Sequence, residues 1–262
     1  MLPDFKMISH KFPERADIEI WPIADVHLGA AEHDTERWMA FCKELANRDN
    51  AYAVVAGDLI NNSTRSSIGN GVFTEVMRPR EQKKLMAEML RPLKDKILCV
   101  VSGNHERRSG KDADDDPTYD ICCKLDIETY YRENMAFVKM HFGKEQTDGQ
   151  RNPTYVLVVV HGSSGGQLTG GVVNRAERFA YVLDGADILI LGHSHKPFTT
   201  APSKIKIDPQ HDSVSFKPFR VVSATSWLNY GGYACQKMLP PTSITPQIIR
   251  LSGKRKQIEV TM

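Results

Sequence analysis

Short apolar runs recur along the chain, and most of them end directly before polar residues that can bind a metal ion. Runs of four to eight residues that are rich in β-branched side chains are typical of buried strands. Segments with helical periodicity separate several of these runs, and such alternation indicates a layered α/β fold. The predicted strands cover residues 18–24, 52–56, 97–101, 155–160, 188–191 and 220–223.

Three helices are predicted between these strands. The first begins after Asp34, whose side chain can cap it, and the second covers 79–90 with proline at its first position. The third is expected over 117–131, behind Asp116. Residues 219–262 contain short strands and turn residues without helical periodicity, so we expect a second, more antiparallel sheet there.

The chain is long enough for one sizeable core. It has 262 residues, 41% of them hydrophobic and 25% charged, and no Ser/Pro-rich linker or internal repeat divides it. We therefore expect a single domain over 1–262. Two polar stretches, 61–80 and 107–118, are expected to be loops that shape a substrate cleft.

Several classes of protein are disfavoured by composition. The N-terminal residues lack the regions of a signal peptide and the apolar runs are too short to cross a bilayer, so we expect a cytoplasmic protein without a membrane partner. Five cysteines without paired spacing argue against a disulfide framework. A net charge of +2 neither requires nor excludes a polyanionic partner. The sequence does not predict the oligomeric state.

Metal-capable side chains follow five of the predicted strands. Asp25 and His27 lie two residues apart on an extended segment, so both side chains point to the same side. The carboxyl ends of strands in an α/β sheet border the crevice where ligands bind, so distant segments can converge there. The complete set is Asp25, His27, Asp58, Asn104, His161, His193 and His195.

The chemical types of the candidate ligands limit which metal ions could bind. Carboxylates, imidazoles and one amide oxygen without a thiolate suit Mn, Fe, Co or Zn better than Ca or a structural zinc. Seven ligands are too many for one zinc, whereas two ions about 3.5–4 Å apart that share a carboxylate would use them all. Asp58 is the candidate bridge. Each motif alone is usually structural, and only the ordered set is specific.

The ordered strings Asp-x-His, Gly-Asp, Gly-Asn-His-Glu, His-Gly and Gly-His-x-His resemble the calcineurin-like metallophosphoesterase superfamily. This resemblance implies a four-layer αββα sandwich of two mixed β-sheets flanked by helices. It also implies two divalent metal ions, with Mn²⁺ expected and Fe, Zn, Co or Ni as alternatives. By the same resemblance Asp25, His27, Asp58 and His195 hold one ion, and Asp58, Asn104, His161 and His193 hold the other.

The resemblance further implies that His105 and Asp58 are the catalytic residues. His105 would lie beside the scissile phosphate and stabilise the transition state or protonate the leaving oxygen, while a metal-bridging hydroxide attacks phosphorus. Asn104, His105, Arg107 and Arg108 are the candidate substrate contacts, because guanidinium groups match phosphate oxygens. For either arginine, a solvated side chain is the ordinary alternative.

Two branches of the superfamily differ after the Gly-Asp string. Protein Ser/Thr phosphatases continue with Val-Asp-Arg-Gly, whereas Leu-Ile-Asn-Asn follows Asp58 here. The string around Asp25 looks more like the DNA-repair exonuclease branch and its small bacterial and phage-encoded relatives, although Glu106 stands where that branch usually has aspartate. We therefore expect a stand-alone phosphodiesterase or nuclease, of phage type, that acts on a phosphodiester such as DNA or a nucleotide.

Other functions stay open. A phosphomonoesterase, acting on proteins or nucleotides, and a cyclic-nucleotide phosphodiesterase use the same metal chemistry. A non-catalytic scaffold of the same fold would tend to lose ligands, and none is missing. A nucleic-acid-binding module without hydrolysis would need a broad basic face, which the mixed charges of 107–116 do not favour.

Overall fold

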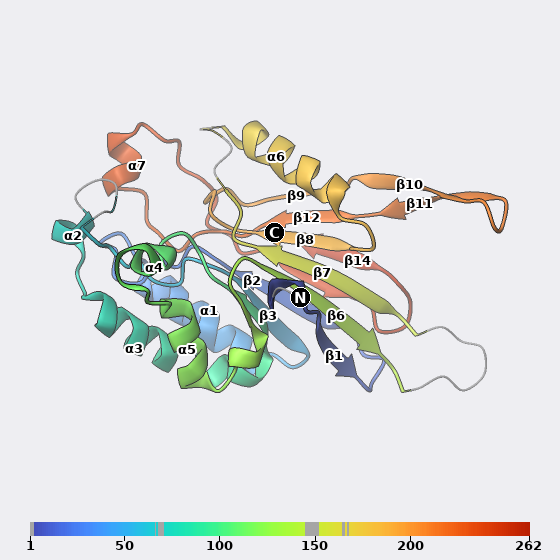
Figure 1. Ribbon diagram of the computed structural model, residues 1–262, viewed down its shortest axis with the longest axis horizontal. Coiled ribbons are helices and arrows are strands. Elements are labelled where there is room, and N and C mark those ends of the chain that lie inside the picture. The colour runs from blue at the N-terminus through green and yellow to red at the C-terminus, as the bar shows by residue number, and fades with distance from the viewer. Residues whose placement is uncertain (1–2, 66, 68–70, 145–151, 164–165, 167) are drawn as a thin grey trace.

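The computed structural model describes residues 3–65, 67, 71–144, 152–163, 166 and 168–262. Figure 1 shows two β-sheets packed between helices. The first sheet has the strand order β14 (Ile258–Thr261), β13 (Ile248–Leu251), β2 (Ile18–Ile23), β3 (Ala51–Ala56), β4 (Ile97–Val101) and β5 (Tyr131–Arg132). The second has the order β1 (Ile8–Phe12), β6 (Met135–Phe142), β7 (Thr154–Val160), β8 (Ile188–Leu191), β12 (Arg220–Ser223) and β9 (Phe198–Thr200). Both sheets are mixed, which confirms the predicted fold class.

Three apolar layers hold the sandwich together. The layer between the two sheets contains Val54 and Leu98 from the first and Leu157 and Ile190 from the second. The outer layers lie under α1 (Thr35–Asn47), α3 (Pro79–Leu90) and α5 (Pro117–Leu125) on the first sheet and under α6 (Thr169–Val182) on the second. Both faces of the parallel strands β3 and β4 are covered, and because of this their sequences are continuous apolar runs.

The predicted strands and all three predicted helix starts are confirmed. The six predicted segments correspond to β2, β3, β4, β7, β8 and β12. Asp34 caps α1, since its carboxylate accepts a hydrogen bond from the Arg37 backbone N–H at 3.0 Å, and α3 has the predicted bounds. The third helix is shorter than predicted, because Asp126 adopts a left-handed conformation (φ 59°) directly after α5. A 3₁₀ turn (Glu128–Tyr130) and β5 follow.

The expected separate sheet at the C-terminal end is wrong. Strand β12 pairs in parallel with β8 in the second sheet, whereas β13 pairs with β2 and extends the first. Without β12 and β13, the outer edges of β8 and β2 would carry unpaired N–H and C=O groups, and the pairing satisfies those groups.

The two predicted cleft loops contain helices. Within 61–80 lie α2 (Gly71–Thr74) and the start of α3, while residues 66 and 68–70 are outside the described part. Most of 107–118 is α4 (Arg107–Ala113) followed by the start of α5, so the loop prediction there is wrong. The chain is already helical at Glu106 (φ −63°, ψ −40°), and this conformation continues until Asp114 turns left-handed at φ 52°. Beyond the second sheet, β10 (Ser203–Asp208) and β11 (Ser213–Pro218) form a hairpin, and α7 (Gly232–Gln236) follows β12.

Two expectations from composition can be compared with the structure. None of the helices in the described part of the chain combines the length and apolar character that a membrane crossing requires. All five cysteines are free, and Cys42, Cys99 and Cys122 are buried. Burial raises the pKa of the Cys42 thiol to about 12, which leaves it protonated and unreactive.

Candidate metal centre

The seven predicted ligands meet at the carboxyl ends of strands from both sheets. Asp25 and His27 follow β2, Asp58 follows β3 and Asn104 follows β4 in the first sheet. From the second sheet, His161 follows β7, and His193 and His195 follow β8. Since the two sheets face each other, these loops approach across the end of the sandwich and form two groups of ligand atoms.

The first group consists of Asp25, His27 and His195. The Nε2 atoms of the two histidines are 3.0 Å apart, and the Asp25 Oδ1 is 3.3 Å from His195 Nε2 and 3.8 Å from His27 Nε2. Among the described residues, His27 Nδ1 has no hydrogen-bond partner, so only its Nε2 is engaged. Two imidazole nitrogens that face each other across 3.0 Å require a proton or a cation between them.

The second group is Asn104, His161 and His193. Asn104 Oδ1 lies 2.8 Å from His161 Nε2 and 2.6 Å from His193 Nδ1, and those two nitrogens are 3.1 Å apart. His161 Nδ1 is 2.7 Å from the Ala56 carbonyl, which can only accept, so this nitrogen carries a hydrogen. The outward Nε2 is thereby oriented as a metal ligand commonly is.

Asp58 lies between the two groups. Its Oδ2 is 3.2 Å from His161 Nε2 in the second group and 3.8 Å from His27 Nε2 in the first. The other oxygen accepts the His105 backbone N–H at 2.9 Å, which fixes the carboxylate plane. One buried carboxylate therefore faces both groups, and the donor set fits two hard or borderline divalent cations.

The electrostatics of the cluster follow from its burial. Burial and the charge of His105 hold the pKa of His27 well below its usual value. Burial also disfavours protonation of His161, but the charge of Asp58 outweighs this and raises the pKa of His161 to about 9. The pKa of Asp58 is well below its usual value, because His161 and His105 outweigh the effect of burial. The carboxylate is therefore charged and attracts cations.

The backbone of the centre is unusually strained. Five of the predicted ligand residues have left-handed φ angles, namely Asp25 (52°), His27 (50°), Asp58 (55°), His193 (68°) and His195 (53°). Such conformations cost on the order of 1 kcal/mol or more for residues other than glycine and persist only where other contacts enforce them. Gly103 permits the closest approach, since a Cβ there would be 2.0 Å from Asp58 Oδ1.

Glu106 is a functional candidate that the sequence reasoning missed. Its fully buried carboxylate accepts the backbone N–H groups of Asp58 (3.1 Å), Ile60 (3.0 Å) and Gly103 (3.0 Å). Burial and the charge of Asp58 raise the pKa of Glu106 to about 7. The acid joins the loops after β3 and β4, which carry Asp58 and Asn104. In the sequence, the position of Glu106 directly after His105 was the one feature that pointed to this role.

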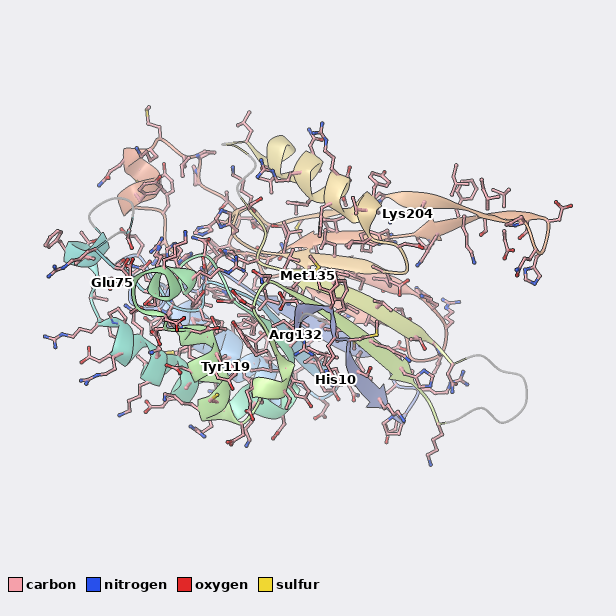
Figure 2. The ribbon with its side chains drawn as sticks, in the orientation of Figure 1. His10, Glu75, Tyr119, Arg132, Met135 and Lys204 are labelled. Carbon is pink, nitrogen blue, oxygen red and sulfur yellow. The ribbon has the colours of Figure 1, made fainter. Side chains whose placement is uncertain are left out.

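His105 lies at the edge of the cluster beside Arg108. Its Nδ1 is 2.8 Å from the Asn61 carbonyl, and its Nε2 is 2.9 Å from an Arg108 Nη2 and 3.8 Å from Asp58 Oδ2. Burial lowers the pKa of His105, and the cationic Arg108 adds to this effect. Asn61 is itself held by Glu75, labelled in Figure 2, whose carboxylate accepts from the Asn61 amide at 3.0 Å.

The structure does not bring Arg107 to the ligand atoms. Its Nη2 donates to the Ser102 and Glu133 carbonyls at 2.9 and 3.1 Å. Neighbours in a helix point about 100° apart, so only one of two successive arginines on α4 can face the centre. That residue is Arg108, and the expectation that Arg107 contacts substrate is not supported by its position.

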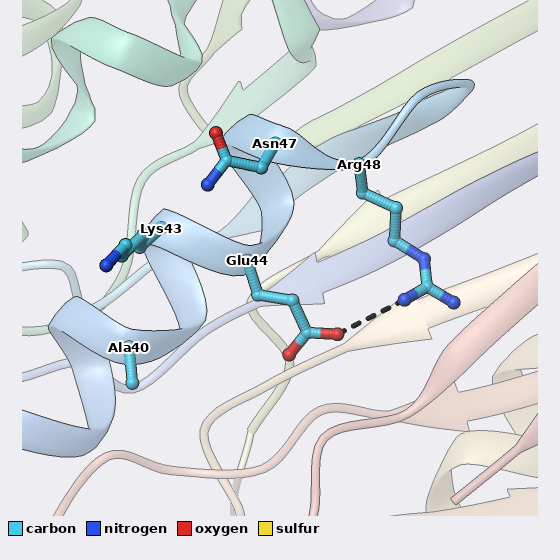
Figure 3. Close-up of a pocket in the computed structure, with 5 residues that line it drawn as sticks. All are labelled: Ala40, Lys43, Glu44, Asn47 and Arg48. Atoms are coloured by element: carbon cyan, nitrogen blue, oxygen red, sulfur yellow. Dashed lines mark hydrogen bonds and ion pairs between the residues drawn. The ribbon is translucent and has the colours of Figure 1, made fainter.

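A surface hollow along α1 is separate from this centre (Figure 3). It is lined by Ala40, Lys43, Glu44, Asn47 and Arg48. Arg48 pairs with Glu44 at 3.2 Å and with Glu19 of β2 at 2.6 Å. Glu19 is near the amino end of its strand, whereas the ligands follow the carboxyl ends, so the hollow belongs to the opposite end of the first sheet.

Comparison with known proteins identifies a family. The family model described as calcineurin-like phosphoesterase matches residues 18–197, a span that includes all seven predicted ligands. None of the curated proteins compared matches this chain.

Three solved structures resemble it in fold. A predicted phosphoesterase from Streptococcus pneumoniae is 12% identical with a TM-score of 0.38, and the alignment covers 94% of this chain and 89% of that one. Vps29 from Chaetomium thermophilum is 12% identical with a TM-score of 0.40, at 93% and 96% coverage. The NAD nucleotidase of Haemophilus influenzae is 10% identical with a TM-score of 0.43, at 95% and 50% coverage.

Proposed function

This chain belongs to the calcineurin-like phosphoesterase family, and from that premise we propose that it is a two-metal phosphodiesterase or nuclease. The observation that carries the proposal is the position of Asp58, whose Oδ2 faces His27 in one group and His161 in the other. A single structural metal would not need a carboxylate between two complete groups of ligands.

The ligand groups support a definite assignment. Asp25, His27 and His195 would hold one cation, and Asn104, His161 and His193 the other, with Asp58 shared between them. Manganese is the proposed metal, as the resemblance to the exonuclease branch implies, and the mixed carboxylate, imidazole and amide ligands are compatible with it as they are with Fe, Co or Zn. Bound cations would neutralise charge on the phosphoryl oxygens and lower the pKa of a water molecule.

The chain's own residues would bind and orient the phosphodiester. Arg108 is held beside His105 by its bonds to that ring and to the Asn61 carbonyl at 3.2 Å, so its guanidinium is available to a phosphate oxygen near Asp58. His105 Nε2 accepts from Arg108 in this structure, so it could donate to the leaving oxygen only after Arg108 turns to the phosphate and the ring gains a proton. Glu106 holds the loop that positions Asp58, so the geometry is set before substrate binds.

The test is metal-dependent hydrolysis of bis-p-nitrophenyl phosphate by wild type and by Asp58→Asn. Wild type should be inactive in EDTA and recover with Mn²⁺, while Asp58→Asn should lose at least 100-fold in kcat/KM, or about 3 kcal/mol. Asp126→Asn is the matched control, because it makes the same chemical change at a similar backbone conformation (φ 59°) on the surface. A folded wild type that stays inert with every metal would refute the proposal.

A second set of assays, with different phosphoester substrates, distinguishes the possible enzyme classes. Cleavage of single- or double-stranded DNA would select the nuclease, and faster hydrolysis of p-nitrophenyl phosphate than of the diester would select a phosphomonoesterase. Hydrolysis of a cyclic nucleotide, and of none of the other substrates, would indicate a cyclic-nucleotide phosphodiesterase. A folded protein that binds Mn²⁺ without hydrolysing any of these would favour a non-catalytic scaffold.

A further inference from the structure

Asn62 is fully buried in the loop that follows β3, shortly after the predicted bridging ligand Asp58. Its Nδ2 donates to the His105 carbonyl at 2.9 Å and to the Glu106 carbonyl at 3.3 Å, directly before α4. It also donates to Ser109 Oγ at 2.9 Å, and that hydroxyl donates back to Asn62 Oδ1 at 3.1 Å. Backbone carbonyls can only accept hydrogen bonds, so the amide NH₂ is the group that faces them. One side chain therefore joins the loop after β3 to the first turn of α4.

The backbone of Asn62 is held from the other side by α3. Its N–H donates to Gln82 Oε1 at 2.9 Å, and Gln82 Nε2 donates to the Met77 carbonyl at 2.6 Å. Gln82 is also fully buried, and Gly29 leaves room for it, since a Cβ at Gly29 would be 2.2 Å from Gln82 Nε2. Asn62 has a left-handed φ of 44°, a conformation that persists only where surrounding contacts enforce it.

The preceding residue, Asn61, contacts the two side chains that are proposed to act on the phosphodiester. His105 Nδ1 is 2.8 Å from the Asn61 carbonyl, and Arg108 Nη1 donates to the same carbonyl at 3.2 Å. Successive side chains of a helix point about 100° apart, so the rotation of α4 decides whether Arg108 faces the centre. Asn61 thus holds the two side chains, whereas Asn62 holds the backbone that carries them.

We propose that Asn62 is a positioning residue for binding of the substrate's phosphate group. By holding the His105 and Glu106 carbonyls it fixes where α4 begins and how the helix is rotated, and this directs Arg108 and the His105 ring toward the metal centre. The role rests on the proposed function, because it concerns phosphate binding at the same site.

A role in metal binding through Glu106 is the main alternative. The Glu106 carboxylate accepts the Asp58 and Gly103 backbone N–H groups and so supports the predicted metal ligands. Asn62 contacts the Glu106 carbonyl instead. If Asn62 positions the phosphate-binding residues, its loss should weaken phosphate binding and leave the affinity for Mn²⁺ nearly unchanged.

The first test compares Asn62→Gly with wild type by isothermal titration calorimetry. Glycine accepts the left-handed backbone of Asn62 and removes only the amide. The affinity of the Mn²⁺-loaded protein for inorganic phosphate should fall about tenfold, as on loss of a hydrogen bond to a charged group, while the Mn²⁺ affinity stays within about twofold. Asn50→Gly is the matched control, because Asn50 has a similar φ of 54° but is exposed at the opposite end of β3. It should bind phosphate and Mn²⁺ like wild type.

A double-mutant cycle shows whether Asn62 acts through Arg108. In the Arg108→Ala background, Asn62→Gly should lower the phosphate affinity by no more than about threefold, because the guanidinium that Asn62 directs is already absent. Fully additive losses would overturn the proposed role. A Mn²⁺ affinity that falls as far as the phosphate affinity would also overturn it and would assign Asn62 to the metal ligands.

Ser109→Ala provides the test if Asn62→Gly does not fold. It removes one partner of the Asn62 amide and should lower the phosphate affinity about threefold, and an unchanged affinity would overturn the role. Wild type that binds no phosphate would overturn it too. Phosphate binding that depends on Asn62 in a protein that hydrolyses no phosphoester would refute the enzymatic function alone. Hydrolysis by wild type together with phosphate binding that is insensitive to Asn62 would refute the positioning role alone.

Discussion

Single residues at the proposed centre differ in how directly they could act on substrate. Asp58 and Asn104 present side-chain oxygens to the cluster, whereas Glu106 acts on them only through the backbone. Replacing a residue that orients a metal ligand typically lowers metal affinity or activity by about 10- to 100-fold. The same distinction separates Arg108, which contacts the His105 ring, from its neighbour Arg107, which donates to the Ser102 and Glu133 backbone carbonyls.

Replacing Glu106 should weaken metal binding. In Glu106→Gln an amide NH₂ would face one of three backbone N–H donors, so we expect the affinity for Mn²⁺ to fall about 10- to 100-fold and the free energy of unfolding to fall by roughly 1–3 kcal/mol. Isothermal titration calorimetry with Mn²⁺ and urea denaturation measure the two effects. The exposed Glu44→Gln serves as the control. Unchanged Mn²⁺ affinity in Glu106→Gln would contradict this role.

Arg107 and Arg108 form a natural matched pair. If Arg108 binds phosphate, Arg108→Ala should lower kcat/KM by roughly 10- to 100-fold, equivalent to the loss of one hydrogen bond to a charged group, while Arg107→Ala leaves the kinetics within about twofold. Steady-state kinetics on bis-p-nitrophenyl phosphate distinguish the two. Equal effects of both substitutions would show that the helical phase of α4 does not determine substrate contact.

At the scale of elements, polar contacts join segments far apart in sequence. Glu19 on β2 accepts hydrogen bonds from Arg48 after α1 at 2.6 Å and from Arg250 on β13 at 3.2 Å. Trp21 Nε1 donates to the same carboxylate at 3.1 Å. Although burial raises the pKa of Glu19, these donors outweigh it, and the net pKa is below its usual value.

This pKa shift predicts how stability depends on pH. Because the folded-state pKa is depressed, the contribution of Glu19 is complete above its unfolded value of 4.5 and is lost as the pH falls through the folded value. Glu19→Gln should be less stable by roughly 1 kcal/mol at pH 7, with the difference shrinking in acid. Urea denaturation of both proteins between pH 3 and 7 tests this. A difference that stays constant down to pH 3 would refute the assignment.

At the scale of the whole molecule, the proposed metals would join the two sheets. Asp25 and His27 come from the first sheet and His195 from the second, and the other group is divided in the same way. A ligand that binds only the folded state stabilises it in proportion to its saturation, by about 2.7 kcal/mol at 100 times its Kd.

Metal removal should therefore lower thermal stability. Addition of Mn²⁺ to EDTA-treated protein at about 100 times the Kd should raise Tm by several degrees. Asp58→Asn should show little of this increase, and Asp126→Asn all of it. Differential scanning calorimetry measures the change without any substrate, so the result does not depend on which phosphoester is cleaved. An equal Mn²⁺ effect in Asp58→Asn would contradict the shared-ligand assignment.

Two of the elements that escaped sequence reasoning, α6 and β6, have weaker local signals than the central strands. α6 begins with Thr-Gly-Gly, a string that is typical of turns, yet its Val172, Ala176 and Ala180 pack on the second sheet. β6 alternates buried and partly exposed residues, a weaker pattern than the continuous apolar runs of the central strands. In α6 tertiary burial overrides local preference, whereas the alternation in β6 agrees with a half-buried strand.

The amino-acid sequence alone was sufficient for the central strands and for the choice of ligand candidates, because apolar runs and the residues that end them are local features. Only the tertiary structure decided that the ligands come from two facing sheets, since strand pairing over long separations is not encoded in any short window. It also decided that Arg108 rather than Arg107 faces the centre and that Glu106 binds three backbone donors. Side-chain direction depends on helix phase and on non-local packing, which become defined only in the assembled molecule.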